Sequence, residues 1–152
     1  HITVEPAETV PCACGKYGCL EQYASATGIV RLAKRMLAES GKPSALRARE
    51  TFTSKDICDL AQQGEEMAAE IVDRFGEYLG RALSYVSCAV DPDVYIVGGG
   101  MSRAGSIVTD AVTGYYRKRR RHLRVRENGA FCINVEFPTA ILPWGLFYEN
   151  LT

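Results

Sequence analysis

Apolar residues recur at helical spacing over long stretches of the chain, and this pattern predicts most of its secondary structure. One amphipathic helix is expected to begin at Leu20 and to end before Ser40-Gly41-Lys42-Pro43, which breaks a helix. A short helix is expected near Thr53, because Thr53 and Asp56 form a potential capping pair. A long helix then runs to Val90. Its expected apolar face comprises Met67, Ile71, Phe75, Leu79, Leu83 and Val86.

Shorter apolar runs predict strands. The segment from Ile2 to Glu5 alternates apolar and polar residues, which predicts a short strand. Residues 94–97 form a β-rich run that we expect to be a buried strand. A further strand is expected over 131–137. A helix is expected over 104–121. The order of these elements indicates a helix-rich α/β domain with a small sheet. Because the chain starts with His1 and not Met, we expect the strands that complete the sheet to precede it in a longer protein.

Composition narrows the class of protein without identifying it. The chain has 152 residues, which suits a single domain over 1–152 with one core. Lys plus Arg and Asp plus Glu both number 18, so the net charge of zero gives no reason to expect a nucleic acid or an anionic membrane as partner. Apolar runs stay well short of the roughly 20 residues that span a bilayer.

One basic run stands against this neutral background. It covers Arg117-Lys118-Arg119-Arg120-Arg121-His122 and continues at Arg124 and Arg126. It invites a nucleic-acid interpretation. We favour a solvated helix end, where cations face the negative end of the helix dipole, because aromatic residues are not interleaved with it.

The six cysteines fall into two groups. Cys58, Cys88 and Cys132 are scattered among apolar neighbours and are expected to be small buried hydrophobes. Cys12, Cys14 and Cys19 are crowded into eight residues and are expected to bind a metal. A reducing, cytoplasmic location fits both groups.

The crowded cysteines predict a zinc site. Zinc prefers four nitrogen or sulfur ligands in a tetrahedron. His1 is the expected fourth ligand, since it is separated from Cys12 by one strand and one loop, whereas His122 lies in the basic run. The alternative is that the three thiols are unliganded or oxidised.

The run Cys12-Ala13-Cys14-Gly15-Lys16-Tyr17-Gly18-Cys19-Leu20-Glu21 resembles the Cys-x-Cys-Gly-x-x-Gly-Cys-x-Glu signature of the ROK family of repressors, open-reading-frame proteins and sugar kinases. Every fixed position is matched. The stretch 21–26 resembles the sequence that follows the motif in family glucokinases, and 91–100 resembles the family's late strand and glycine turn.

The resemblance implies the C-terminal lobe of an actin/hexokinase-type (ribonuclease H-like) fold and a set of site residues. It implies that His1 contacts zinc with one ring nitrogen and a sugar hydroxyl with the other, and that Glu21 accepts hydrogen bonds from the sugar. It places Gly98, Gly99 and Gly100 beside a nucleotide. Taken alone, Glu21 is also an ordinary acid in the first turn of a helix, and the glycines are also an ordinary strand-to-helix turn.

The implied parent protein is an ATP-dependent glucokinase that uses magnesium-bound ATP and glucose or a related hexose, and that forms a homodimer. The family's Asp-x-Gly phosphate loop and catalytic Asp have no counterpart here, and 138–152 does not match the family's usual ending. We therefore expect this chain alone not to phosphorylate sugar. Two alternatives stay open: the effector domain of a sugar-responsive repressor, and a zinc-stabilised module for subunit association.

Overall fold

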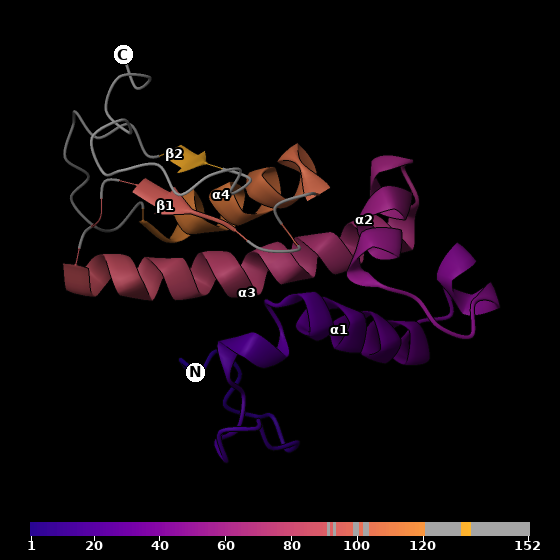
Figure 1. Cartoon of the computed structure of the whole chain (residues 1–152), viewed down its shortest axis with the longest axis horizontal. Helices are drawn as coiled ribbons and strands as arrows, with labels where there is room; N and C mark the ends of the chain where they lie inside the picture. Colours follow the sequence, from indigo (N-terminus) through magenta and orange to yellow (C-terminus); the bar gives the residue numbers. More distant parts are fainter. Residues whose placement is uncertain (91, 93, 99–100, 102–103, 121–131, 135–152) are drawn as a thin grey trace.

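The structure, a computed structural model, describes residues 1–90, 92, 94–98, 101, 104–120 and 132–134. Helix α3 runs through the middle of the molecule, with α1 on one side and α4 and the strands on the other (Figure 1). The described elements follow in the order η1 (Leu20–Gln22), α1 (Ala26–Glu39), η2 (Ala45–Ala48), α2 (Ser54–Gln62), α3 (Glu66–Val90), β1 (Val94–Ile96), α4 (Ser106–Arg120) and β2 (Cys132–Asn134).

The helix expected from Leu20 is in fact two elements. Residues Leu20–Gln22 form the 3-10 turn η1, and α1 begins only after Ser25, whose side-chain oxygen accepts the Gly28 N–H at 2.9 Å. A Cβ on Gly28 would lie 2.8 Å from the carbonyl oxygen of Glu21. The break therefore folds η1 back over the first turn of α1, an arrangement that apolar spacing alone does not reveal.

The capping pair at the start of α2 is confirmed. The Thr53 backbone N–H donates to Asp56 Oδ2 at 2.8 Å, and the Asp56 N–H donates to Thr53 Oγ1 at 3.3 Å. Gly64 then takes a positive φ of 84° and turns the chain into α3. At the start of α3 the Ala68 N–H donates to Glu65 Oε2 at 2.8 Å, which satisfies one of the helix's free donors.

Two glycines let α3 and α4 pack closely. A Cβ on Gly76 would lie 2.6 Å from the Ala111 Cβ, and a Cβ on Gly80 would lie 2.8 Å from the Val112 carbonyl oxygen. Neither distance is available to a real side chain. The glycines are therefore required by the close approach of α4.

The C-terminal half of α3 buries a different face from the one expected. Leu83 and Val86 are only partly buried, whereas Ser84 and Ser87 are 6% and 5% exposed. The small residues are inside because α4 packs over them. The first half of the helix follows the prediction, and its apolar residues join α1, α2 and α4 in the main core.

The strands β1 and β2 pair in parallel, with Val94 opposite Cys132. They confirm two of the expected strands, but the expectation that 94–97 is buried is wrong, since Ile96 is 58% exposed. The strand expected at 2–5 is also wrong. Among the described residues, that segment forms only an isolated antiparallel bridge between Thr3 and Cys19.

The isolated cysteines behave unequally. Cys58 is 3% exposed, as expected, and burial raises the pKa of its thiol to about 11. Cys88 is exposed, so the expectation that it is buried is wrong. The side chains of Cys132 and Arg120, and all of the basic residues from Arg121 onward, lie outside the described part. Within that part, none of the helices is both long and apolar enough to cross a membrane.

Candidate functional site: a cysteine and histidine cluster

The cysteine loop, residues 8–19, is held by its own backbone. Pro11 and Tyr17 form an antiparallel bridge, and the Cys12 N–H donates to the Lys16 carbonyl at 2.7 Å. The Gly15 N–H donates to the Cys12 carbonyl at 2.8 Å. These bonds close a tight turn that brings Cys12 and Cys14 to the same end of the loop.

A second set of backbone bonds brings the N-terminal residues to the loop. The Val4 N–H donates to the Gly18 carbonyl at 2.8 Å, and the Leu20 N–H donates to the Ile2 carbonyl at 2.8 Å. Gly18 takes a positive φ of 66° to make this possible. The pairing carries His1 to the three cysteines, eleven residues and more away in sequence.

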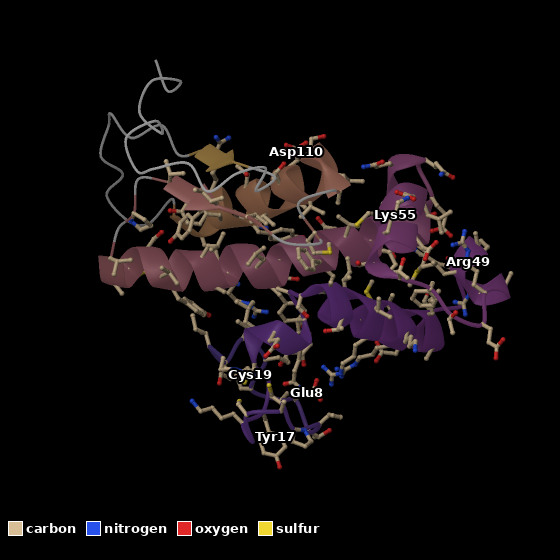
Figure 2. All side chains as sticks on the ribbon, in the orientation of Figure 1. Glu8, Tyr17, Cys19, Arg49, Lys55 and Asp110 are labelled. Atoms are coloured by element: carbon tan, nitrogen blue, oxygen red, sulfur yellow. The ribbon has the colours of Figure 1, made fainter. Side chains whose placement is uncertain are left out.

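Four potential ligand atoms meet at this end of the loop. The side chains of His1, Cys12, Cys14 and Cys19 place one ligand atom each within 4.8 Å of one another. Cys14 Sγ lies 3.5 Å from Cys19 Sγ, and Cys12 Sγ lies 3.6 Å from His1 Nδ1. Figure 2 shows Cys19 and Tyr17 in this loop, at the opposite side of the molecule from α4.

These distances fit a tetrahedral zinc ion. A zinc–sulfur bond of about 2.3 Å gives a tetrahedron whose edges are about 3.8 Å long. The separations between Cys14 and Cys19 and between Cys12 and His1 are close to that length, and three thiols with one imidazole are a usual donor set for structural zinc. The residues present therefore fit the metal that the sequence predicts.

The cluster is half-open to solvent, and its thiols differ. Cys12 and Cys19 are buried, whereas Cys14 is exposed. Hydrogen bonding from the Lys16 backbone lowers the pKa of the Cys14 thiol. Burial, followed by the neighbouring thiols, raises the pKa of Cys19 to about 11. A divalent cation would favour the thiolate at both positions.

Glu21 lies beside the cluster on its open side. Glu21 Oε2 is 3.6 Å from His1 Nδ1, and the two side chains are 61% and 50% exposed. The structure thus brings both predicted sugar-contacting residues together at the solvent-facing side of the cysteine loop. Gly98 is exposed, but Gly99 and Gly100 lie outside the described residues, so the predicted nucleotide turn stays a prediction.

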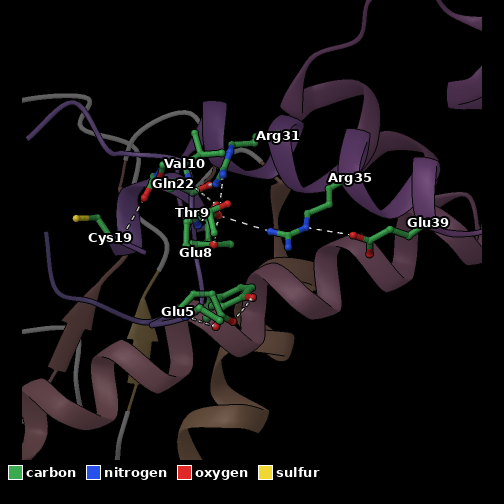
Figure 3. Close-up of polar contacts among 12 residues, drawn as sticks. Glu5, Glu8, Thr9, Val10, Cys19, Gln22, Arg31, Arg35 and Glu39 are labelled. Atoms are coloured by element: carbon green, nitrogen blue, oxygen red, sulfur yellow. Dashed lines mark hydrogen bonds and ion pairs between the residues drawn. The ribbon is translucent and has the colours of Figure 1, made fainter. Parts of the chain in front are cut away.

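Two residues that sequence reasoning did not single out also hold the loop in place, one at its first position and one shortly after its end. Glu8 is a carboxylate whose side chain is only 3% exposed, and Gln22 bonds to two parts of the loop (Figure 3). Gln22 follows Glu21 and stands three residues after Cys19, the spacing of a capping box, which is a signal that could have identified it. Nothing in the sequence near Glu8 indicates its burial.

Comparisons with known proteins agree with the motif. The sequence model of the ROK family matches residues 1–132. The chain is 38% identical over 120 residues to a glucokinase of Halalkalibacterium halodurans, an overlap that covers 76% of this chain and 36% of the relative.

Solved structures show the same fold. A ROK family glucokinase from Streptomyces griseus, crystallised with glucose and AMPPNP, matches with a TM-score of 0.69 and 32% identity, over 78% of this chain and 39% of that one. A ROK family transcriptional regulator homologous to the Escherichia coli Mlc protein matches with a TM-score of 0.67 and 34% identity, over 78% and 29%. This chain therefore spans about a third of the length of the proteins it matches. Its motif, its family match and its fold agree, and the chain belongs to the ROK family.

Proposed function

We propose that this chain is the sugar-binding, zinc-containing part of an ATP-dependent glucokinase. The observation that carries the proposal is the place of Glu21 beside His1 on the open side of a four-ligand cluster. The similarity to glucokinases, one of them crystallised with glucose and AMPPNP, supports the same substrate class. The parent protein would act in the cytoplasm as a homodimer on glucose and magnesium-bound ATP.

In this proposal His1, Cys12, Cys14 and Cys19 hold zinc. Bound zinc would supply a fixed orientation and tautomer for the His1 ring. Nδ1 is the ring nitrogen beside Cys12, which leaves Nε2 for a sugar hydroxyl. An imidazole ring whose orientation is already fixed loses little conformational entropy when it forms that hydrogen bond.

Glu21 would contribute the complementary contact. An ionised carboxylate only accepts hydrogen bonds, and sugar hydroxyls donate them. Because Glu21 is more than half exposed, it can exchange water for a hydroxyl without leaving a buried charge unpaired. Gly98, Gly99 and Gly100 would approach the nucleotide, and the catalytic base would come from the N-terminal lobe of the parent protein.

Elemental analysis of the purified chain tests the metal. We expect one zinc per chain, and we expect its loss in Cys14→Ser, which removes an exposed ligand without opening a core cavity. Folded protein that was never exposed to a chelator and contains no zinc would contradict the proposal.

A glucose titration tests the sugar site. Glu21→Gln should weaken binding by at least about tenfold, because an amide replaces a charged acceptor. Glu66→Gln is the control, since Glu66 is 77% exposed and pairs with Lys42 rather than with any residue of the loop. Equal glucose affinities in the two variants would show that Glu21 does not contact the sugar.

The alternative is the effector domain of a ROK repressor. The regulator structure supports it almost as well as the glucokinase structure does, with TM-scores of 0.67 and 0.69. The parent protein decides between them: phosphorylation of glucose with ATP favours the kinase, and sugar-sensitive binding to operator DNA without turnover favours the repressor.

A further inference from the structure

We propose that Glu8 and Gln22 are positioning residues that hold the cysteine loop in the geometry its metal and sugar ligands need. The inference rests on the proposed function and extends it to two residues outside the ROK motif. Its basis is that the two side chains form hydrogen bonds to the backbone of the loop on both sides of Cys12 and Cys14, at Val10 and at Cys19 (Figure 3).

Glu8 fixes the start of the loop. Its Oε1 accepts the Thr9 N–H at 3.0 Å and the Val10 N–H at 2.9 Å. Its Oε2 accepts the Tyr23 hydroxyl and the Arg31 guanidinium, the latter at 2.7 Å. One buried carboxylate thereby joins the loop, the end of η1 and α1.

The charge of Glu8 is well compensated. Burial by itself would raise the pKa of this carboxyl, but hydrogen bonds from Tyr23, Val10 and Arg31 outweigh burial and lower it to about 2. A second guanidinium, that of Arg35, lies 3.5 Å from Oε2. Glu8 is therefore ionised at neutral pH and holds its partners with charge-assisted hydrogen bonds, which are the strong kind.

Gln22 holds the loop from the other side, and we call Glu8 and Gln22 together the loop frame. Its Nε2 donates to the Val10 carbonyl at 3.0 Å, and its Oε1 accepts the Cys19 N–H at 3.1 Å. With Glu8 on its N–H, Val10 has both backbone groups bonded by side chains. Val10 stands two residues before Cys12, so these bonds restrict the backbone that leads to this metal ligand. The bond to the Cys19 N–H holds the backbone of a second metal ligand directly.

The loop frame packs on a buried pair of tyrosines. Tyr23 is 2% exposed, and its ring stacks on that of Tyr78 with centroids 4.3 Å apart. The Tyr78 hydroxyl donates to Glu5 Oε2 at 3.2 Å. Glu21 lies next to Gln22 in η1. The tyrosine pair therefore also positions the backbone of the predicted sugar-binding carboxylate relative to the four predicted zinc ligands.

The decisive variant is Gln22→Met. It keeps the volume of the side chain but loses both hydrogen bonds to the loop, and because Gln22 is partly exposed the variant should fold. Glu8→Gln is the companion variant. It removes the charge opposite Arg31 and is the more destabilising change. Glu70→Gln is the control, because Glu70 pairs with Lys42 at the far end of α1 and α3.

Zinc affinity by chelator competition is the first measurement. Outer hydrogen-bonding partners of metal ligands typically affect metal affinity by about 10-fold to 100-fold. We expect Gln22→Met and Glu8→Gln each to weaken zinc binding about tenfold or more. Glu70→Gln should leave zinc affinity unchanged and change the stability of the fold little, because its ion pair with Lys42 is half-exposed and Lys42 also pairs with Glu66. Visible spectra of the cobalt-substituted chain should shift in the two frame variants only, because they report ligand geometry rather than stability.

The outcomes separate this inference from the proposed function. Zinc in the wild-type chain, with affinities and cobalt spectra in Gln22→Met equal to those of the control, would overturn the inference and leave the zinc proposal intact. A wild-type chain without zinc would overturn both. The inference is supported if Gln22→Met binds both zinc and glucose more weakly than wild type while its stability is similar to that of Glu70→Gln.

Discussion

The two glycines of the cysteine loop should respond very differently to alanine, although both have positive φ. Gly15 has a φ of 82° and nothing within 4 Å of the place a Cβ would take. Gly18 has a φ of 66°, and its Cβ would lie 1.8 Å from the carbonyl oxygen of Glu5. Gly15→Ala therefore tests the cost of conformation alone, and Gly18→Ala tests conformation together with a backbone collision.

The magnitudes follow from these distances. A residue with a Cβ loses about 1 kcal/mol in the left-handed region, and this is the whole expected cost of Gly15→Ala. In Gly18→Ala the new Cβ and the Glu5 oxygen must separate by roughly 1.5 Å to reach an ordinary contact of about 3.3 Å. That shift breaks the bonds from the Val4 and Glu5 N–H groups to the Gly18 carbonyl, at 2.8 and 3.2 Å. With each bond worth about 1 kcal/mol, the total cost is about 3 kcal/mol.

Denaturant unfolding of the zinc-saturated chain measures these costs, and chelator competition measures the effect on the metal. We expect Gly18→Ala to lose about 3 kcal/mol and to bind zinc at least tenfold more weakly, while Gly15→Ala loses about 1 kcal/mol and keeps its zinc affinity within about threefold. Equal losses in the two variants would refute the reasoning, because only Gly18 meets another part of the backbone.

Two further predictions concern parts of the fold remote from the loop. Gly80→Ala should destabilise the chain by about 1–2 kcal/mol, because overpacking against the α4 backbone exceeds the gain in helix propensity, whereas Gly114→Ala, with open space around its Cβ, should stabilise α4 by about 0.5–1 kcal/mol. Thermal unfolding of both variants tests this pair, and a stabilised Gly80→Ala would show that the helices are not in close contact there. Asp56→Asn should show a pH dependence: hydrogen bonds from Thr53, and then the guanidinium of Arg49, lower the pKa of Asp56 from 3.8 to about 2. Its stabilising contribution is therefore complete above the unfolded pKa and is lost as pH falls through the folded one, so the gap in unfolding free energy between wild type and Asp56→Asn should shrink from about pH 5 to about pH 2. A gap that stays constant would show that the carboxylate charge does not stabilise α2.

The main helices were predictable because their own apolar residues decide them. The capping pair Thr53 and Asp56 and the run from Met67 to Phe75 carry local signals, and the structure agrees with them. The second half of α3 was mispredicted for a tertiary reason. Residues such as Ser84 are inside because α4 covers them, and a hydrophobicity pattern cannot show which neighbour will arrive.

The candidate site divides in the same way. Cysteine spacing within eight residues is local, so it indicates a shared ligand set before any fold is known. Glu8 is the opposite case, because its burial depends on Arg31, which is 23 residues away. A lone glutamate in a loop is usually solvated. Only the fold shows that this one is enclosed by a tyrosine, an arginine and two backbone N–H groups.

The same division explains why the chain alone does not separate the kinase from the repressor. Both activities need a sugar to be recognised, and His1, Glu21 and the cysteine loop would serve either. What would distinguish them is a base that takes the hydroxyl proton or a domain that reads DNA. On the proposed function, either would lie in the part of the parent protein that corresponds to the roughly two thirds of the relatives' length that this chain does not match. A substitution in the loop frame should therefore weaken sugar recognition by about the same factor in either kind of parent protein. In a kinase the loss should appear as a higher KM for glucose with little change in kcat, because Gln22 contacts the loop and not the reacting atoms. A large fall in kcat at unchanged KM would instead place the loop in the chemical step.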